Sequence, residues 1–522
     1  MDRDRLTGLV VIAALMIVYF QFIAPRQAAR RALGGGATNA AVAAATAPAR
    51  APAPVIGAPG AVQAESPMPA VGAPPRDELQ LAPLSNDCVT FTFANYDASI
   101  SAIELARTPI VRKGPIVTAC AESNNWEMPL RLRRLGAHDH TGAVLAVESA
   151  GASALSYTGV VADGVMLRAA YVLTNEYFLH AEMTFSNLSS TAYADTNTCA
   201  FWLGRINHVG AAGDRYDIPG VDVSVAGRNG KPAVQRVKPE KKDSAKVIDG
   251  PVEWLAVRNK YFTHILVPDE PALAASVYSC GPAGDRQVTA SAAFVMPPMP
   301  PGAAFHWRAT LYAGPKAFEQ LDTLAARIGR GQGYIEILNL GWFSILAKPI
   351  LIYGLKGLYR YVHNYGIAII ILTVIIKLLT WPLQTKSFES MQRMQKLQPE
   401  LKELQAKYKS DPRKLQQEQM LLYRKHGVNP LGGCLPVALQ IPVFIALYAA
   451  LSNAIELWGA SFWWIKDLSL PDTVAHLPFS IPFMGDGVNP LPLLMTVATI
   501  GQQILTPHTG DKSQKQMMYM MP

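Results

Sequence analysis

Charged residues are scarce in this chain. Asp, Glu, Lys and Arg make up 16% of its 522 residues, whereas a soluble domain carries about 25%. Hydrophobic residues make up 50% and the mean hydropathy is +0.14, which excludes one compact soluble domain and indicates membrane spans joined to water-facing parts. The net charge of +8 would favour nucleic-acid binding only if the basic residues gathered on one folded soluble face.

Cysteine is also rare, and its spacing carries no metal signature. The five cysteines are Cys88, Cys120, Cys199, Cys280 and Cys434. None lies in a CxxC or Cys/His pattern, so a zinc site has no support. The first four could form two disulfides in an oxidising compartment or be small buried residues, and the sequence leaves both open.

Motifs for catalysis are missing as well. The chain has no hydrolase elbow, no HExxH and no Walker A sequence. His138, Asp139 and His140 look metal-like, but nearby glycines favour a turn. We therefore expect no enzymatic activity, no cofactor and no bound metal.

The N-terminus contains a long apolar run from Leu6 to Ala24. At about 1.5 Å per residue it can cross a bilayer. A cleaved signal peptide is the alternative, but Phe20, Gln21 and Phe22 form a poor cleavage site. We predict an uncleaved anchor over residues 1–25, followed by a flexible Ala/Pro/Gly-rich tether over residues 26–84.

Residues 85–320 show a period of two, which predicts half-buried antiparallel strands. Apolar residues alternate with polar ones in three clear runs: Val89, Phe91 and Phe93; Leu179, Ala181, Met183 and Phe185; Trp307, Ala309 and Leu311. In the last run, Thr310 and Tyr312 alternate with the apolar residues and are therefore predicted on the opposite, polar face of the strand. Gly/Pro/Asn/Asp clusters separate the strands, so this region predicts a β-sandwich domain.

Helical periods follow. Gly341–Val362 mixes large apolar residues with Lys348, Lys356 and Arg360, which favours an amphipathic helix in the membrane interface within a linker at 321–364. We predict transmembrane helices over residues 365–383, 430–455 and 491–507. Between them lie a helical hairpin at 384–429 and a loop at 456–490; residues 508–522 form another loop and the start of a fifth helix.

Charge between the predicted spans gives the orientation. Residues 384–429 hold ten basic and five acidic residues, so five of the eight net positive charges lie there. Residues 456–490 hold Lys466 against four acids. The positive-inside rule puts the first loop in the cytoplasm and the second outside, which places the N-terminus in the cytoplasm and the β-domain in the periplasm. Nucleic-acid binding thereby loses its main support.

The basic loop is itself predicted to be a helical hairpin. Apolar residues recur at steps of three and four up to Tyr408, and Ser410-Asp411-Pro412 can turn the chain and cap a second helix. A solvated spacer is one interpretation. The other is a docking arm for a ribosome, nascent chain or acidic lipid, with candidate contacts Arg393, Lys396, Lys402, Lys407, Arg413 and Lys414.

A lysine at membrane depth is the main candidate site. Lys377 costs about 2.5–3.5 kcal/mol there unless it faces protein or water, although its stem could snorkel to the cytoplasmic surface. The helical spacing puts Thr373, Lys377, Thr380 and Gln384 on one face, and other spans offer Gln440, Thr496, Thr499 and Gln503. These polar stripes predict a hydrophilic cavity within the bilayer.

Four motifs resemble the YidC membrane protein insertase family. They are YRKHGVNPLGGCLPVALQIPVFIALYAAL at Tyr423–Leu451, KLLTWPL at Lys377–Leu383, MQKLQPELKELQAKY at Met394–Tyr408 and WLAVRNKYF at Trp254–Phe262. The resemblance implies a polytopic α-helical transmembrane core, a periplasmic β-supersandwich, a cytoplasmic helical hairpin and a groove open to cytoplasm and lipid. The groove charge is usually arginine in the family, and Lys377 keeps the charge but not the bidentate fork.

The resemblance also implies function and partners. Family members insert nascent membrane proteins into the bacterial inner membrane, alone or with the Sec translocon, and the expected partners are nascent chains, that translocon, a ribosome and the phospholipid bilayer. Thr373 and Lys377 would contact substrate. The family continues with two more spans after the MMYMMP segment, whereas this sequence stops at Pro522, so we expect a truncated sequence.

Two other functions are possible from the residues alone. A channel or secondary transporter could use Lys377 as an ion or substrate site; inverted repeats would favour it, and none is evident. Alternatively, the β-domain could be a sugar- or peptide-binding module anchored by the helices. Polar faces inside those helices argue against mere anchoring.

Overall fold

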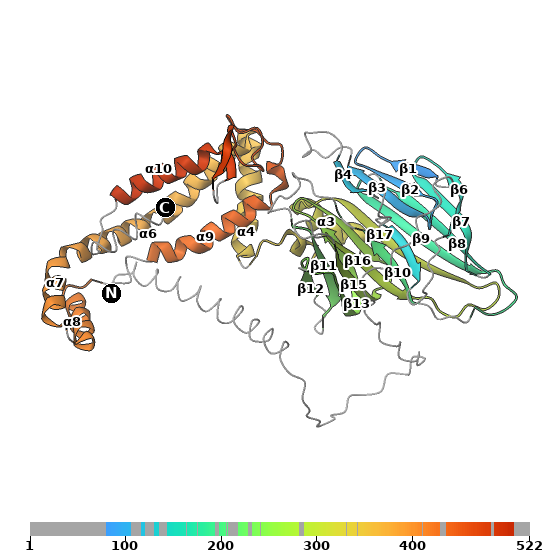
Figure 1. Ribbon diagram of the computed structural model, residues 1–522, viewed down its shortest axis with the longest axis horizontal. Coiled ribbons are helices and arrows are strands. Elements are labelled where there is room, and N and C mark those ends of the chain that lie inside the picture. The colour runs from blue at the N-terminus through green and yellow to red at the C-terminus, as the bar shows by residue number, and fades with distance from the viewer. Residues whose placement is uncertain are drawn as a thin grey trace, which may run out of the picture. The chain divides into compact units, whose positions relative to one another are not determined.

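The computed structural model describes residues 80–105, 116–120, 130–134, 143–162, 164–174, 176–193, 198–204, 206, 218–227, 232–240, 242–280, 287–329, 331–341, 343–409, 411–428, 435–481 and 485–505. The predicted anchor, most of the tether, His138–His140, Cys434 and residues 508–522 lie outside this part of the chain. The described part consists of a β-domain followed by helices (Figure 1).

The β-domain is built from strands joined by antiparallel pairing into one sandwich-like sheet. The strands are β1 Leu81–Ser85, β2 Val89–Ala94, β3 Ser99–Leu105, β4 Ile116–Cys120, β5 Leu130–Arg134, β6 Ala146–Ala150, β7 Ala154–Ala162, β8 Val165–Leu173, β9 Phe178–Asn187, β10 Thr198–Leu203, β11 Gly220–Ala226, β12 Pro232–Val237, β13 Ser244–Arg258, β14 Phe262–Pro268, β15 Ala272–Cys280, β16 Gln287–Val295 and β17 Ala304–Pro315. The first strand begins before residue 85, where the predicted domain starts.

The predicted alternation holds in two of the three runs. The apolar residues of β2 and β9 are buried, whereas Thr90 and Thr92 are half-buried. In β17 the prediction is wrong beyond Ala309, because Thr310 and Tyr312 are buried as well. The Tyr312 ring packs 5.5 Å from Phe178 and its hydroxyl donates to the Pro315 carbonyl at 2.8 Å. Side chains on both faces of the C-terminal end of β17 are therefore shielded from solvent.

Asp222 of β11 binds two arginines from neighbouring strands, and one of these arginines also binds the segment that follows the β-domain. Its buried carboxylate accepts from Arg258 Nε at 2.6 Å and from Arg236 Nε at 2.9 Å. Arg236 also donates to Asn339 Oδ1 and to the Glu336 carbonyl, both at 2.6 Å. One carboxylate thus fixes β11, β12 and β13 beside the 3₁₀-helix η3 (Tyr334–Leu338).

The cysteine question is partly answered. Cys88 has a free thiol, and burial raises its pKa. A disulfide through Cys88 is therefore absent from this structure.

The remaining elements are mostly helical. They are α3 Phe318–Ile328, α4 Ser344–Pro349, the π-helix η4 Ile350–Lys356, α5 Gly357–Val362, α6 Tyr365–Lys396, α7 Gln398–Lys407, α8 Pro412–Lys425, α9 Leu435–Ser452, the 3₁₀-helix η6 Ile455–Leu457, β18 Ala475–Ile481, β19 Gly485–Val488 and α10 Pro490–Leu505. Among the described residues, α6 is the one helix both long and apolar enough to cross a membrane. It runs unbroken past residue 383, where the predicted span ends.

The segment predicted as an interfacial helix packs more deeply than its sequence indicates. Lys356 has a side chain only 16% exposed, with Nζ 2.7 Å from Glu456 Oε1. Glu456, which follows α9, supplies a counter-charge that the local sequence around Lys356 does not reveal. A Cβ added to Gly354 would lie 2.7 Å from the Leu372 side chain, so η4 and α6 pack closely there.

We predict that Asp222→Asn destabilises the chain strongly. The substitution leaves the buried Arg258 without its counter-charge, so the free energy of unfolding should fall by about 3–5 kcal/mol. Thermal unfolding of the full chain in detergent measures the change. Asp249→Asn, at an exposed position of β13, is the matched control; equal effects of the two substitutions would contradict the role of Asp222.

We also predict a pH dependence from His264. Burial lowers the pKa of this histidine to about 3, against about 6.5 in an unfolded chain. Between about pH 6.5 and pH 3 this histidine is therefore protonated in the unfolded state but neutral in the folded state. The free energy of unfolding should fall by about 1.4 kcal/mol for each pH unit of decrease in that range. His264→Leu removes this contribution, so its melting temperature relative to wild type should rise from pH 7 to pH 4. A pH-independent difference would show that His264 does not contribute.

Candidate functional site

The candidate groove residues of α6 lie along one uninterrupted helix. Asn364 caps its start by accepting from the Ile367 amide at 3.2 Å, and the helix continues through Pro382. The side chains of Thr373 and Lys377 are exposed, and those of Thr380 and Gln384 are half-buried. The predicted polar stripe is therefore accessible along its length.

The threonine hydroxyls are satisfied within their own helices. Thr373 Oγ1 donates to the Ile369 carbonyl at 2.8 Å, and Thr380 Oγ1 to the Ile376 carbonyl at 3.0 Å. In α10, Thr496 and Thr499 bond in the same way at 2.9 and 2.7 Å. A hydroxyl bonded to its own backbone needs no partner on another helix but keeps a lone pair for a passing polar group.

Lys377 differs from these threonines. Its side chain is exposed and, within the described part of the chain, takes part in no ion pair. It stands among apolar neighbours that are also exposed: Leu378 at 64%, Leu379 at 75% and Trp381 at 65%. A charge on such a helix needs water, a headgroup or a polar substrate beside it.

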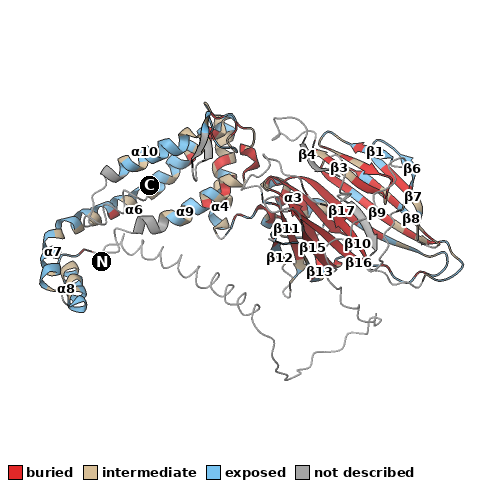
Figure 2. Cartoon of the chain, in the orientation of Figure 1, coloured by how far each residue is buried: buried red, intermediate tan, exposed pale blue. Residues whose placement is uncertain are grey.

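The remaining candidate groove residues lie on α9 and α10. Gln440 is half-buried on α9 and Thr499 on α10, and the side chain of Gln503 lies outside the described residues. No hydrogen bond between helices joins the described side chains of the predicted groove. Figure 2 shows exposed residues along α6, α9 and α10, so polar and apolar side chains of these helices remain open to surrounding molecules.

Two helices, α7 and α8, follow α6 in the region of the predicted hairpin. Asp411 caps α8 by accepting from the Lys414 amide at 3.1 Å, as its sequence indicates. His426 Nε2, just after α8, lies 3.4 Å from Glu400 Oε2 near the start of α7, so the helices run antiparallel. The six candidate docking residues, Arg393, Lys396, Lys402, Lys407, Arg413 and Lys414, are all exposed.

A junction between the β-domain and the helices was not foreseen from the sequence. Trp458, after η6, stacks on Tyr261 with ring centroids 5.5 Å apart and meets Phe262 edge-on at 5.2 Å. The two partners lie in the WLAVRNKYF motif, whose aromatic residues were the available signal. Basic side chains from this part of the β-domain, Lys238, Arg258, Lys260 and Lys316, line a cavity at the junction.

Comparison with known proteins gives one consistent family. A family model described as "60Kd inner membrane protein" matches residues 357–522, and one described as "YidC periplasmic domain" matches residues 146–353. The chain is 31% identical to membrane protein insertase YidC of Chlorobaculum tepidum over 100% of this chain and 89% of that relative. It is 42% identical to membrane protein insertase YidC of Pelobacter propionicus over 53% of this chain and 49% of that relative.

Two solved structures are weakly similar. One, described as an active YidC insertase with the first transmembrane domain resolved, aligns over 84% of this chain and 85% of its own, with 16% identity and a TM-score of 0.30. A galactose mutarotase related enzyme from Lactobacillus acidophilus aligns over 45% and 97%, with 12% identity and a TM-score of 0.35.

Proposed function

This chain belongs to the YidC membrane protein insertase family, and we propose that it inserts nascent membrane proteins through a polar groove beside α6. The observation that carries the proposal is the exposed charge of Lys377 on an apolar helix long enough to cross a bilayer. Thr373, Thr380, Gln384, Gln440, Thr499 and Gln503 are the proposed polar lining. The role is one of binding and guiding, without an enzymatic step or a cofactor.

The proposed mechanism is electrostatic. A hydrophilic segment that enters the hydrocarbon core loses its water contacts, and an acidic one is especially costly to transfer. A lysine within the span attracts that segment in a medium of low dielectric constant, and hydroxyl and amide groups can replace part of its hydration. Both effects lower the barrier to crossing, while the apolar helices of the substrate leave the groove sideways into lipid.

We propose the topology and partners on the same basis. The exposed bases of α7 and α8 suit the cytoplasmic side, where they would contact a ribosome, a nascent chain or acidic phospholipids. The β-domain then lies in the periplasm and the N-terminus in the cytoplasm of a multi-pass inner-membrane protein. Larger substrates would be handled together with the Sec translocon.

We predict opposite outcomes for two substitutions of Lys377. Lys377→Arg keeps the charge and should insert substrates normally. Lys377→Glu repels acidic segments and should slow their insertion about tenfold or more, which corresponds to a barrier change of about 1.4 kcal/mol. Insertion of a substrate with an acidic translocated segment, measured in cells depleted of their own insertase, tests this. Normal insertion by the glutamate variant would refute the electrostatic mechanism.

Site-specific photocrosslinking separates the insertase from a channel. A photoreactive residue at Thr373 should crosslink to a stalled nascent membrane protein. The matched control is Ile375, which lies on the opposite face of the same helix at 100° per residue and should crosslink to lipid. An absence of nascent chain at both positions would contradict the groove.

We predict that the hairpin charges act in docking. The double substitution Arg413→Glu/Lys414→Glu reverses two charges in the first turn of α8, where acidic residues suit the helix dipole, so the helix should remain folded. Binding to ribosomes that carry a membrane-protein nascent chain should weaken at moderate salt. Lys242→Glu/Lys246→Glu in the β-domain is the control, and equal binding by both variants would identify the hairpin as a spacer.

A further inference from the structure

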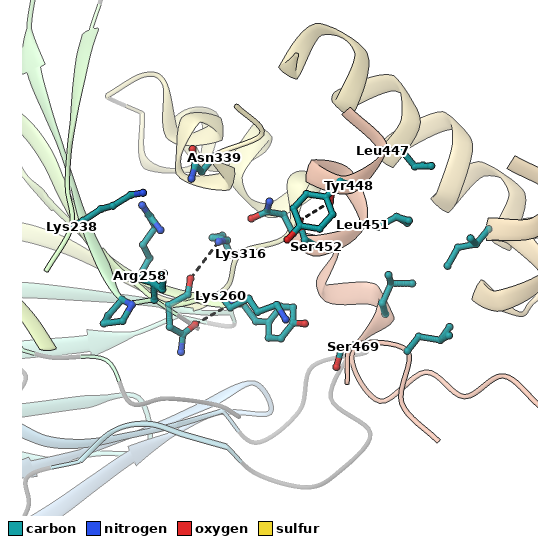
Figure 3. Close-up of a pocket in the computed structure, with 18 of the residues that line it drawn as sticks. Lys238, Arg258, Lys260, Lys316, Asn339, Leu447, Tyr448, Leu451, Ser452 and Ser469 are labelled. Atoms are coloured by element: carbon teal, nitrogen blue, oxygen red, sulfur yellow. Dashed lines mark hydrogen bonds between the residues drawn. The ribbon is translucent and has the colours of Figure 1, made fainter. Parts of the chain in front are cut away.

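A cavity of about 610 Å³ lies between the β-domain and the helices (Figure 3). Its volume falls within the range of about 300–1,000 Å³ that is usual for small-molecule sites. One wall comes from the β-domain, including the turn Asn259–Tyr261 between β13 and β14. The other comes mainly from the second half of α9, with Ile369 of α6.

The β-domain wall is basic. Its charged members are Lys238, Arg258, Lys260 and Lys316, and no acidic side chain is present among the described residues that line the cavity. Arg258 shares its charge with Asp222 behind the wall, whereas Lys238 is exposed and Lys260 half-buried. Lys316 is buried, and its Nζ donates to the Asn259 carbonyl at 3.3 Å. The wall therefore presents a positive potential to whatever enters.

The helical wall is apolar over most of its length. Phe444, Leu447, Tyr448 and Leu451 recur at three- and four-residue steps and form one face of α9. Phe444 is 63% and Tyr448 56% exposed, so these rings remain available for contact. A ligand that satisfies both walls must be anionic at one end and hydrocarbon at the other.

We propose that this cavity binds an anionic phospholipid. The phosphate of the headgroup lies against Lys238 and Lys260, and one acyl chain runs along the Phe444–Tyr448 face of α9. A soluble anion would leave the apolar wall unused, and a neutral lipid would leave the basic wall unused. Because the lipid touches both walls, it links the β-domain to α9. The assignment uses the membrane placement of the helices proposed above but does not depend on the Lys377 groove.

Native mass spectrometry of the full chain in detergent tests the assignment. The probes are phosphatidylglycerol, phosphatidylcholine with the same acyl chains, and inorganic phosphate. We expect phosphatidylglycerol to be retained at least about tenfold better than phosphatidylcholine, and inorganic phosphate not to displace it. Equal retention of the two lipids, or displacement by phosphate alone, would overturn the proposal.

Matched variants localise the binding. Lys238→Gln/Lys260→Gln should remove most of the preference for phosphatidylglycerol, whereas Lys242→Gln/Lys246→Gln, which changes two exposed lysines outside the cavity, should keep it. Phe444→Ser should weaken retention, and Ile441→Ser, an exposed position of α9 that does not line the cavity, should not. Equal losses in a variant and its control would also overturn the proposal. Since the readout is bound lipid, it is separate from insertion activity.

Discussion

The ion pair between Lys356 and Glu456 joins parts of the chain that are far apart in sequence. Both side chains are mostly buried, and Nζ lies 2.7 Å from Oε1. Removing Lys356 would leave the Glu456 carboxylate, whose side chain is 7% exposed, charged in a poorly hydrated place, which is costly. The pair therefore holds the end of η4 against η6, and Trp458, two residues after Glu456, packs on Tyr261 of the β-domain. The Lys356–Glu456 pair and the Trp458–Tyr261 contact therefore lie where the start of α6, the end of α9 and the β-domain come together.

Beyond that junction the helices are suited to a different solvent from the β-domain. Leu379 of α6 is 75% exposed, and Met495 and Val497 of α10 are 69% and 68% exposed. Apolar surface in water costs about 25 cal/mol per Å², so these exposed side chains favour hydrocarbon over water around the helices. Their backbone groups are bonded within each helix, as a bilayer requires. The β-domain instead buries most of its apolar residues, and Figure 2 shows buried residues along its strands.

The sequence predicted those features that depend on neighbouring residues. Alternation in β2 and β9 and the Asp411 cap of α8 were confirmed, because each is set within a few residues of chain. The burial of Tyr312 was missed because it depends on Tyr177 and Phe178, which come from another strand and loop. The basic cavity was missed for the same reason, since its two walls lie far apart in sequence.

The candidate groove illustrates the same limit. Spacing alone puts Thr373, Lys377 and Thr380 on one face of α6, but spacing does not show which polar groups find partners. The threonines bond their own helix, as many membrane threonines can, so they are weak evidence for a cavity.

Two lysines of the helical region make the distinction clear. Lys356 and Lys377 both follow apolar runs, and their local sequences do not show which of them has an acidic partner. Lys356 has an acidic partner from a distant segment and serves the fold. Lys377 has no such partner in the described part of the chain and stands on a helix that is apolar around it. A charge at membrane depth without a structural partner is unfavourable for stability, and the proposed contact of Lys377 with polar segments of a substrate would offset that cost.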